Sequence, residues 1–282
     1  MSSKSRLTPA QHEIFQGMAA KWVKYLPLAL ICAGFCASVY GSTRFFASIG
    51  EADVTPSTMD YLLYLFKGME VYIPGPDSPF DIPYIWMVPN LYVAFMTASY
   101  PTRDLSGFGK HILMRSGTRT GWYLNKCGWV TANVLVCYLM IYLPPLLFSL
   151  FTGNLSFASG GAAMRGVLGA DYGMADPAAL LRAVIFLPIL TSLALSLLQM
   201  LLEFVLRPIF GFAIIACLLV TSAYLYTPAL IGNFSIFLRS EFVMGAEGLR
   251  LIQGVIINLC LIAAAVIAGC LYFRKHDILD KS

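Results

Sequence analysis

The sequence predicts an all-α integral membrane protein with six transmembrane helices. Apolar residues make up 58% of the 282 residues and charged residues only 12%, which is about half of the charged fraction in soluble domains. The mean hydropathy is +0.72. Six windows without a charged residue are each long enough to cross the hydrocarbon core of a bilayer, which takes about 20 helical residues. These properties exclude a soluble enzyme, a disordered chain and a nucleic-acid-binding protein.

We expect two parts, a cytoplasmic interfacial arm over residues 1–24 and a single six-helix transmembrane domain over residues 25–282. In the arm, Thr8 and Pro9 suit the start of an amphipathic helix that lies in the headgroup plane. The apolar run that follows exceeds the hydrophobic region of a signal peptide, so we expect it to remain as the first span. The spans are predicted at residues 25–46, 82–100, 128–151, 181–204, 209–230 and 251–273.

The distribution of basic residues predicts the orientation. Thirteen of the 19 Lys and Arg residues fall in the N-terminal arm, the second and fourth loops and the C-terminal tail, which all lie on one side of a six-span chain. Cytoplasmic loops of membrane proteins are enriched in Lys and Arg. We therefore expect a multi-pass protein of the cell membrane with both termini cytoplasmic.

The longest predicted cytoplasmic loop contains a second amphipathic segment. Leu105, Phe108 and Ile112 recur at helical spacing, and Arg103 and Arg115 flank them. A short helix of this kind could dock into a cytoplasmic partner or rest on anionic lipid. The residue spacing does not distinguish these two roles.

Two predicted outer connections are unusual. Residues 44–81 carry six acidic residues and include an apolar stretch, 59–66, that is too short to cross the membrane. We expect a helix on the surface of the outer leaflet and a solvated acidic face, while selection of cationic cargo is the alternative. The uncharged run from Pro208 extends 31 residues, which exceeds what the fifth span needs, and the apolar residues Phe242, Val243 and Met244 follow Glu241. We therefore expect a helical piece buried against protein in the outer half of the membrane. An ordinary interfacial loop is the alternative.

The sequence contains no motif for catalysis. The charge-free windows leave only Cys and Tyr as titratable groups at mid-depth, and Glu203, Arg182 and Arg207 are expected to reach water from the span ends. No phosphate-binding loop or hydrolase motif occurs, and the seven Cys and three His residues show no metal-ligand spacing. We therefore predict a protein that is not an enzyme, with no catalytic, cofactor-binding or metal-binding residues, so uphill transport would draw energy from another polypeptide.

Three local segments resemble the type-2 family of ABC exporter permeases, in particular its small Gram-positive-type members. The segments are Ile112–Arg119 followed by Trp122 and Lys126, then Ile231–Arg239, and Tyr272–Leu279. The six spans and the cytoplasmic ends agree with this resemblance. It implies that the arm is a connecting helix beside the ATPase.

The resemblance also implies two sites. The first is a coupling helix that contacts the ATPase partner, with Arg103, Leu105, Phe108, Ile112 and Arg115. The second is an outer gate, with Gly232, Asn233, Phe234 and Phe237.

The function implied by the resemblance is that of a transmembrane permease subunit in an ATP-driven exporter. Two permease halves, identical or paralogous, would pair with ATP-binding cassette subunits that hold ATP and magnesium. Membrane lipid is the further expected partner, and nucleic acid is not one. The nearly charge-free spans suit hydrophobic or amphipathic cargo, such as a peptide, lipid or drug. The outer loop 44–81 is longer than in the family, so its role stays open.

Two alternatives remain at this stage. The chain could be a non-transporting membrane sensor or scaffold whose basic loop binds a cytoplasmic regulator. A secondary transporter is the third interpretation, and the missing mid-membrane carboxylate disfavours it.

Overall fold

The computed structural model describes residues 22–48, 55–75, 81–98, 119–158, 166–169 and 175–275, and the regular secondary structure in this part of the chain is helical. One isolated bridge, between Ser240 and Leu249, is the β-type contact within these residues. The all-α prediction is thereby confirmed. The main helices are α2 (Leu26–Ser48), α3 (Thr58–Phe66), α4 (Tyr84–Thr97), α7 (Arg119–Thr152), α9 (Pro177–Val205), α10 (Pro208–Tyr224) and α12 (Leu251–Lys275), and a 3-10 turn, η1 (Trp22–Tyr25), leads into α2.

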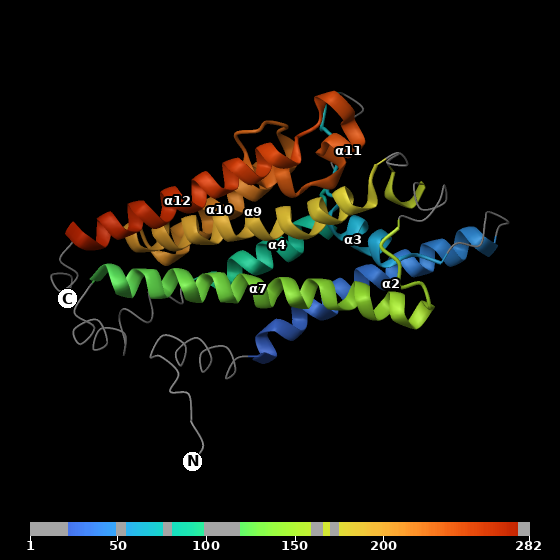
Figure 1. Cartoon of the computed structure of the whole chain (residues 1–282), viewed down its shortest axis with the longest axis horizontal. Helices are drawn as coiled ribbons and strands as arrows, with labels where there is room; N and C mark the ends of the chain where they lie inside the picture. Colours follow the sequence, from blue (N-terminus) through green and yellow to red (C-terminus); the bar gives the residue numbers. More distant parts are fainter. Residues whose placement is uncertain are drawn as a thin grey trace, which may run out of the picture.

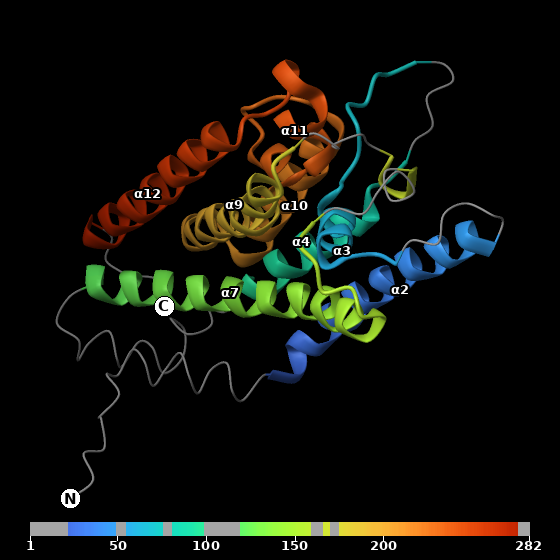
Figure 2. The same ribbon diagram turned by 45° about the vertical axis from the view of Figure 1, so that its right-hand side comes forward.

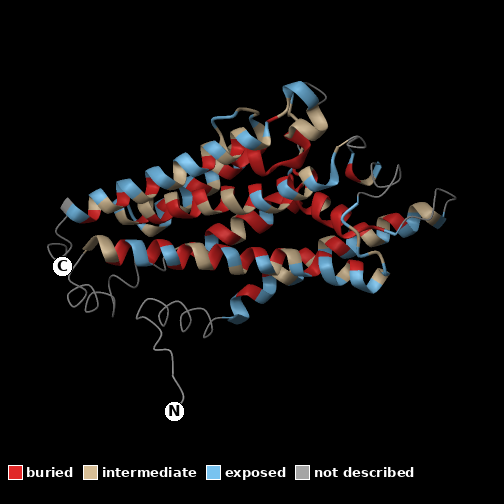
Figure 3. Ribbon diagram, in the orientation of Figure 1, coloured by how far each residue is buried: buried red, intermediate tan, exposed pale blue. Residues whose placement is uncertain are grey.

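Helix α9 lies at the centre of the bundle. It packs against α4, α7, α10 and α12, and 61% of its most apolar window is buried. In Figure 1, α12 lies at one edge, α2 and α7 lie at the opposite edge, and α9 and α4 lie between them. The buried residues face the interior of the bundle and the exposed ones face outward (Figure 3). Helix α12 diverges from α7 toward one end, as the turned view shows (Figure 2).

Four helices are long and apolar enough to cross a membrane. They are Trp22–Ser48, Arg119–Thr152, Pro177–Val205 and Leu251–Arg274, and they coincide with four of the six predicted spans. These four helices indicate a multi-pass membrane protein. The other two predicted spans correspond to shorter helices, since α4 has 14 residues and α10 has 17.

Helix α10 ends at Tyr224, although the sequence analysis placed the end of the fifth span at residue 230. Pro228 explains the difference, because proline lacks the N–H that would bond to the carbonyl of Tyr224 one turn earlier. The backbone is extended at Leu225, with φ −104° and ψ 121°. The residues after Tyr224 therefore form a separate structure.

The prediction of a surface helix at residues 59–66 is wrong in its location. Helix α3 forms there, but it packs against α2, α4, α7 and α9. Asp60 is completely buried rather than solvated, and its carboxylate accepts hydrogen bonds of 2.8 Å from the backbone N–H and the hydroxyl of Ser57. This capping box and the helix N-terminus compensate for the lost hydration of the carboxylate, so all of α3 except Tyr64 can be buried.

The expectation that Glu203 reaches water is also wrong. Its side chain is buried at 2% exposure, and one carboxylate oxygen accepts a 2.8 Å hydrogen bond from Nε2 of Gln199. Gly211 of α10 lies so close that an added Cβ would sit 2.5 Å from Cγ of Glu203. Glu203 is covered because a glycine allows α10 to approach this face of α9.

One end of the bundle is closed by an aromatic cluster from three helices. Phe204 of α9 and Tyr123 of α7 both contact Phe273 of α12, with ring centroids 4.9 and 5.2 Å apart, respectively. An added Cβ at Gly269 would lie 2.0 Å from Cζ of Tyr123. The close approach of α12 to α7 therefore requires glycine at this position.

We predict that Gly269→Ala lowers the stability of the protein by about 1–3 kcal/mol, because the new methyl group overlaps the ring of a buried tyrosine. The matched control is Gly34→Ala in α2, where a Cβ meets no atom within 4 Å. Thermal unfolding of both variants in one detergent, followed by tryptophan fluorescence, measures the difference. Equal midpoints for the two variants would contradict the helix contact.

Candidate functional site

The connection between α10 and α12 folds into a compact unit over the ends of the neighbouring helices (Figure 2). We call residues 225–250 the cap. It contains η2 (Ile231–Ser235), η3 (Phe237–Arg239), α11 (Glu241–Met244) and η4 (Gly245–Glu247). All four predicted outer-gate residues lie in η2 and η3 and are buried. An ordinary interfacial loop does not fit this burial.

Arg239 is the central residue of the cap, and its side chain is fully buried. Nη1 donates a 2.6 Å hydrogen bond to the carbonyl of Ser222 and a second bond to Oδ1 of Asn233. Nη2 donates to the carbonyls of Ala223 and Glu70, the latter at 3.1 Å. The carbonyls of the last helical turn have no partner within their own helix. Arg239 therefore caps the end of α10 and ties it to the segment before α4.

The electrostatic environment of Arg239 is unusual for a buried cation. Among the described residues, its hydrogen-bond acceptors are carbonyl and amide oxygens and include no carboxylate. Burial lowers the pKa of Arg239 to about 10, and Tyr226 acts in the opposite direction. The guanidinium is still charged at neutral pH, and the negative end of the α10 dipole favours a cation here.

Asn233 and Gly232 position the chain beside the end of α10. Nδ2 of Asn233 donates to the carbonyls of Leu225 and Thr227 at 2.9 and 3.1 Å. An added Cβ at Gly232 would lie 2.6 Å from Oγ of Ser222. Glycine is thus needed where η2 meets α10, and asparagine stabilises the bend that follows Tyr224.

The two predicted gate phenylalanines anchor the cap in apolar surroundings. Phe234 clusters with Leu187 of α9 and Leu249, and an added Cβ at Gly254 of α12 would lie 2.8 Å from Cδ1 of Phe234. Phe237 belongs to the main hydrophobic core. The cap is therefore packed into the bundle as well as hydrogen-bonded to it.

The cap also contacts α4 and the segment before it. Nε1 of Trp86 donates to Oγ of Ser235 at 3.1 Å, and the backbone N–H of Leu238 donates to the carbonyl of Lys67 at 3.1 Å. Ile236 covers Gly68, which has a positive φ of 65° and no room for a Cβ. Four helices, α4, α9, α10 and α12, thus meet at this one unit.

Uncharged polar side chains connect α4, α7 and α9 in the interior of the bundle. Oγ of Ser192 donates to Oδ1 of Asn90 at 3.2 Å and lies 2.7 Å from the hydroxyl of Tyr138. Nδ2 of Asn133 donates to Oγ1 of Thr97 at 3.4 Å. Interhelical hydrogen bonds of this type stabilise helix contacts in a membrane. Within the described ranges, no group of three His, Cys, Asp or Glu residues could hold a metal ion.

The predicted coupling helix lies outside the described residues. This applies to Arg103, Leu105, Phe108, Ile112 and Arg115, and also to residues 1–21 of the arm. The contact with an ATPase partner stays a prediction from the sequence.

Arg239 is the residue at the centre of the cap that the sequence did not single out, because it entered the prediction only as the last residue of the segment Ile231–Arg239. Two sequence signals point to it. Pro228 ends α10 early and leaves carbonyls without partners, and Arg239 follows an apolar run that has no other donor of this reach. The buried link between Trp86 and Ser235 has no comparable signal.

We predict that Arg239→Met lowers stability by about 3 kcal/mol, because four acceptor oxygens lose their donor inside the protein. The stability of Arg239→Lys should lie between that of Arg239→Met and that of the wild type, since an ammonium group cannot bridge the same set of acceptors. The control is Arg250→Met, because Arg250 is exposed. Thermal unfolding and the rate of proteolysis within the cap are the measurements. An Arg239→Met variant as stable as the control would contradict the role of Arg239.

Residues 55–279 match a protein family that is described as "Protein of unknown function (DUF2705)". The matched region includes the cap and the predicted coupling helix. No curated protein and no solved structure matches the chain.

Proposed function

We propose that this chain, which belongs to the DUF2705 family, is the transmembrane permease subunit of an ATP-driven ABC exporter. Its cargo would be hydrophobic or amphipathic, and ATP would be hydrolysed with magnesium in a separate ATP-binding cassette subunit. A second permease half, identical or paralogous, completes the transporter. The proposal includes six spans, with α4 and α10 as the two short ones, and both termini in the cytoplasm.

The single observation that carries the proposal is the closed cap. Its predicted gate residues are buried, and its bonds connect the ends of helices that come from different parts of the chain. A separation of α4 from α10 must break either the bonds of Arg239 to the end of α10 or the bond between Trp86 and Ser235. A unit of this kind suits a gate, since hydrogen bonds to carbonyls can be replaced by bonds to water when the site opens.

The lengths of α4 and α10 are compatible with thin spans. With a rise of 1.5 Å per residue, the 17 residues of α10 measure about 25 Å and the 14 residues of α4 about 21 Å. A spanning helix takes about 17–25 residues, so α10 is at the lower limit and α4 needs its flanking residues. The bias of Lys and Arg supports the orientation, in which the cap lies on the outer side.

Glu203 favours a second candidate, a secondary transporter. A buried carboxylate can bind and release a proton during transport, and Glu203 is buried beside Gln199, whose Nε2 also donates to the carbonyl of Ala94 on α4. Its place in the last turn of α9, rather than at mid-helix, supports the exporter instead. Two results together would identify the secondary transporter. Transport by the wild type would require a proton gradient and no ATP, and the Glu203→Gln variant would lose all transport.

We predict that the tagged full chain copurifies from its native membrane with a Walker-type ATPase. The triple variant Leu105→Asp, Phe108→Asp, Ile112→Asp should retain less than about a tenth of this partner, because three carboxylates on the apolar face oppose docking. Leu155→Asp is the control, since Leu155 is exposed and lies in the segment after the C-terminal end of α7. The amount of partner per chain is measured by mass spectrometry.

Two outcomes would contradict this prediction. Retention of the ATPase by the triple variant would place the docking surface elsewhere. Copurification of a regulator without ATPase motifs, together with no ATP-driven cargo movement in reconstituted vesicles, would favour the sensor or scaffold.

A further inference from the structure

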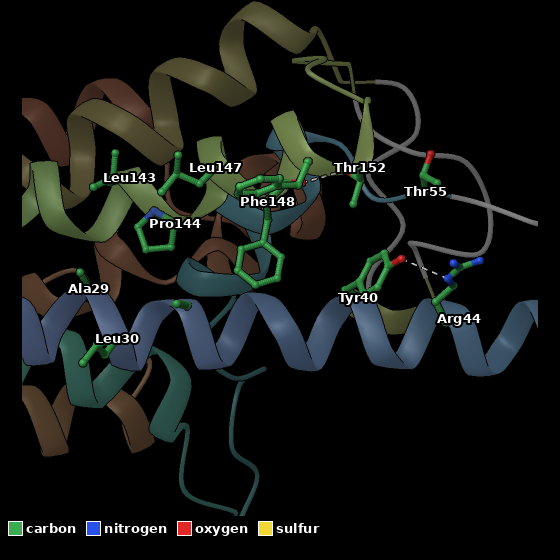
Figure 4. Close-up of a pocket in the computed structure, with 12 residues that line it drawn as sticks. Ala29, Leu30, Tyr40, Arg44, Thr55, Leu143, Pro144, Leu147, Phe148 and Thr152 are labelled. Atoms are coloured by element: carbon green, nitrogen blue, oxygen red, sulfur yellow. Dashed lines mark hydrogen bonds between the residues drawn. The ribbon is translucent and has the colours of Figure 1, made fainter.

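Helices α2 and α7 enclose a groove of about 740 Å³ along one edge of the bundle (Figure 4). This volume is in the range of small-molecule sites in proteins. One part of the groove has only apolar walls, which come from Ala29, Leu30 and Ala33 of α2 and from Leu143 and Leu147 of α7. The groove is separate from the cap, which lies against α4, α9, α10 and α12.

The other end of the groove is polar and carries a cation. Figure 4 shows Tyr40, Arg44, Thr55 and Thr152 at this end, away from Leu30. Nε of Arg44 donates to the hydroxyl of Tyr40 at 3.2 Å, and its guanidinium lies 5.5 Å from the centre of the same ring. No acidic side chain among the described residues forms an ion pair with Arg44. The ion pair that these residues do contain joins Arg182 and Asp176 at the start of α9, outside the groove. The guanidinium is therefore positioned by a tyrosine rather than neutralised by a carboxylate.

The dimensions of the groove match one leaflet of a membrane. Leu30 and Arg44 are separated by 14 residues of one helix, which is about 21 Å at 1.5 Å per residue. Half of a hydrocarbon core is about 15 Å, so a cation at one end and apolar walls over the rest correspond to a headgroup and its chains. The walls are open at the side, since Leu30 is 70% exposed and Phe151 is 85% exposed. A lipid could thus reach the groove laterally.

We infer that this groove binds an anionic phospholipid, with the phosphate at Arg44 and an acyl chain between α2 and α7. The planar guanidinium matches the geometry of a phosphate group, and its charge selects an anionic headgroup over a zwitterionic one. A second copy of this chain would cover the apolar walls but would not use the cation at their polar end. The inference goes beyond the proposed function, because lipid binding by this chain needs no ATPase partner and no transport.

The test uses the purified full chain in phosphatidylcholine vesicles that contain a trace of spin-labelled phosphatidylglycerol or spin-labelled phosphatidylcholine. Electron paramagnetic resonance gives the motionally restricted fraction of each label. We expect the wild type to prefer the anionic label and Arg44→Gln to lower this preference about fivefold, which corresponds to the attraction of one basic residue for anionic lipid. Arg182→Gln is the matched control, since Arg182 is an exposed arginine that is already paired with Asp176 at 3.9 Å.

A second variant tests the apolar part of the site. Ala33→Trp fills the groove and should reduce the motionally restricted fraction of the anionic label. If Ala33→Trp unfolds at a lower temperature than the wild type, Leu147→Trp is used in its place. An equal loss of preference in Arg44→Gln and Arg182→Gln would overturn the inference. So would an unchanged label signal in a filled variant that stays folded. A filled variant that changes only the oligomeric state would assign the groove to a second copy of the chain.

Discussion

The structure depends on one constraint, which is that the carbonyls at the end of α10 must find donors inside the protein. Pro228 prevents the helix from continuing, so carbonyls of its last turn have no partner within the helix, and Arg239 donates to those of Ser222 and Ala223. The same guanidinium also bonds to Asn233 and Glu70. An early helix end and a buried arginine are therefore parts of one arrangement, and the cap is its consequence.

Close contacts at glycines determine how the helices pack around α9. Gly211 brings α10 against Glu203, Gly269 brings α12 against Tyr123, and Gly232 brings the cap against Ser222. In a bilayer the lipid chains are as apolar as leucine, so helices associate through close packing and interhelical hydrogen bonds. The buried Asn, Ser and Thr side chains between α4, α7 and α9 supply the hydrogen bonds. Small residues and uncharged polar residues thus have the roles that large apolar residues have in a soluble core.

The cap and the groove are two surfaces of different character. The cap is a closed unit of buried groups that contacts α4, α9, α10 and α12, whereas the groove is an open surface between α2 and α7 with a cation at one end. In the proposed exporter, the cap would control the exit and the groove would contact lipid. No residue that lines the groove belongs to the cap, so a variant in one can be studied without direct change to the other.

The sequence by itself determined the class of the protein and the positions of its main helices, because apolar windows and helix length are local properties. It also located the buried residues Gly232, Asn233, Phe234 and Phe237 in a segment that packs against protein, since the uncharged run from Pro208 is longer than one span needs. The tertiary structure alone decided that α3 is buried, that Glu203 is covered, which acceptors Arg239 bonds to, and that Arg44 shares a groove with residues about 100 positions away. These features depend on which helices become neighbours. Periodicity and hydropathy describe each helix separately and contain no distance between them.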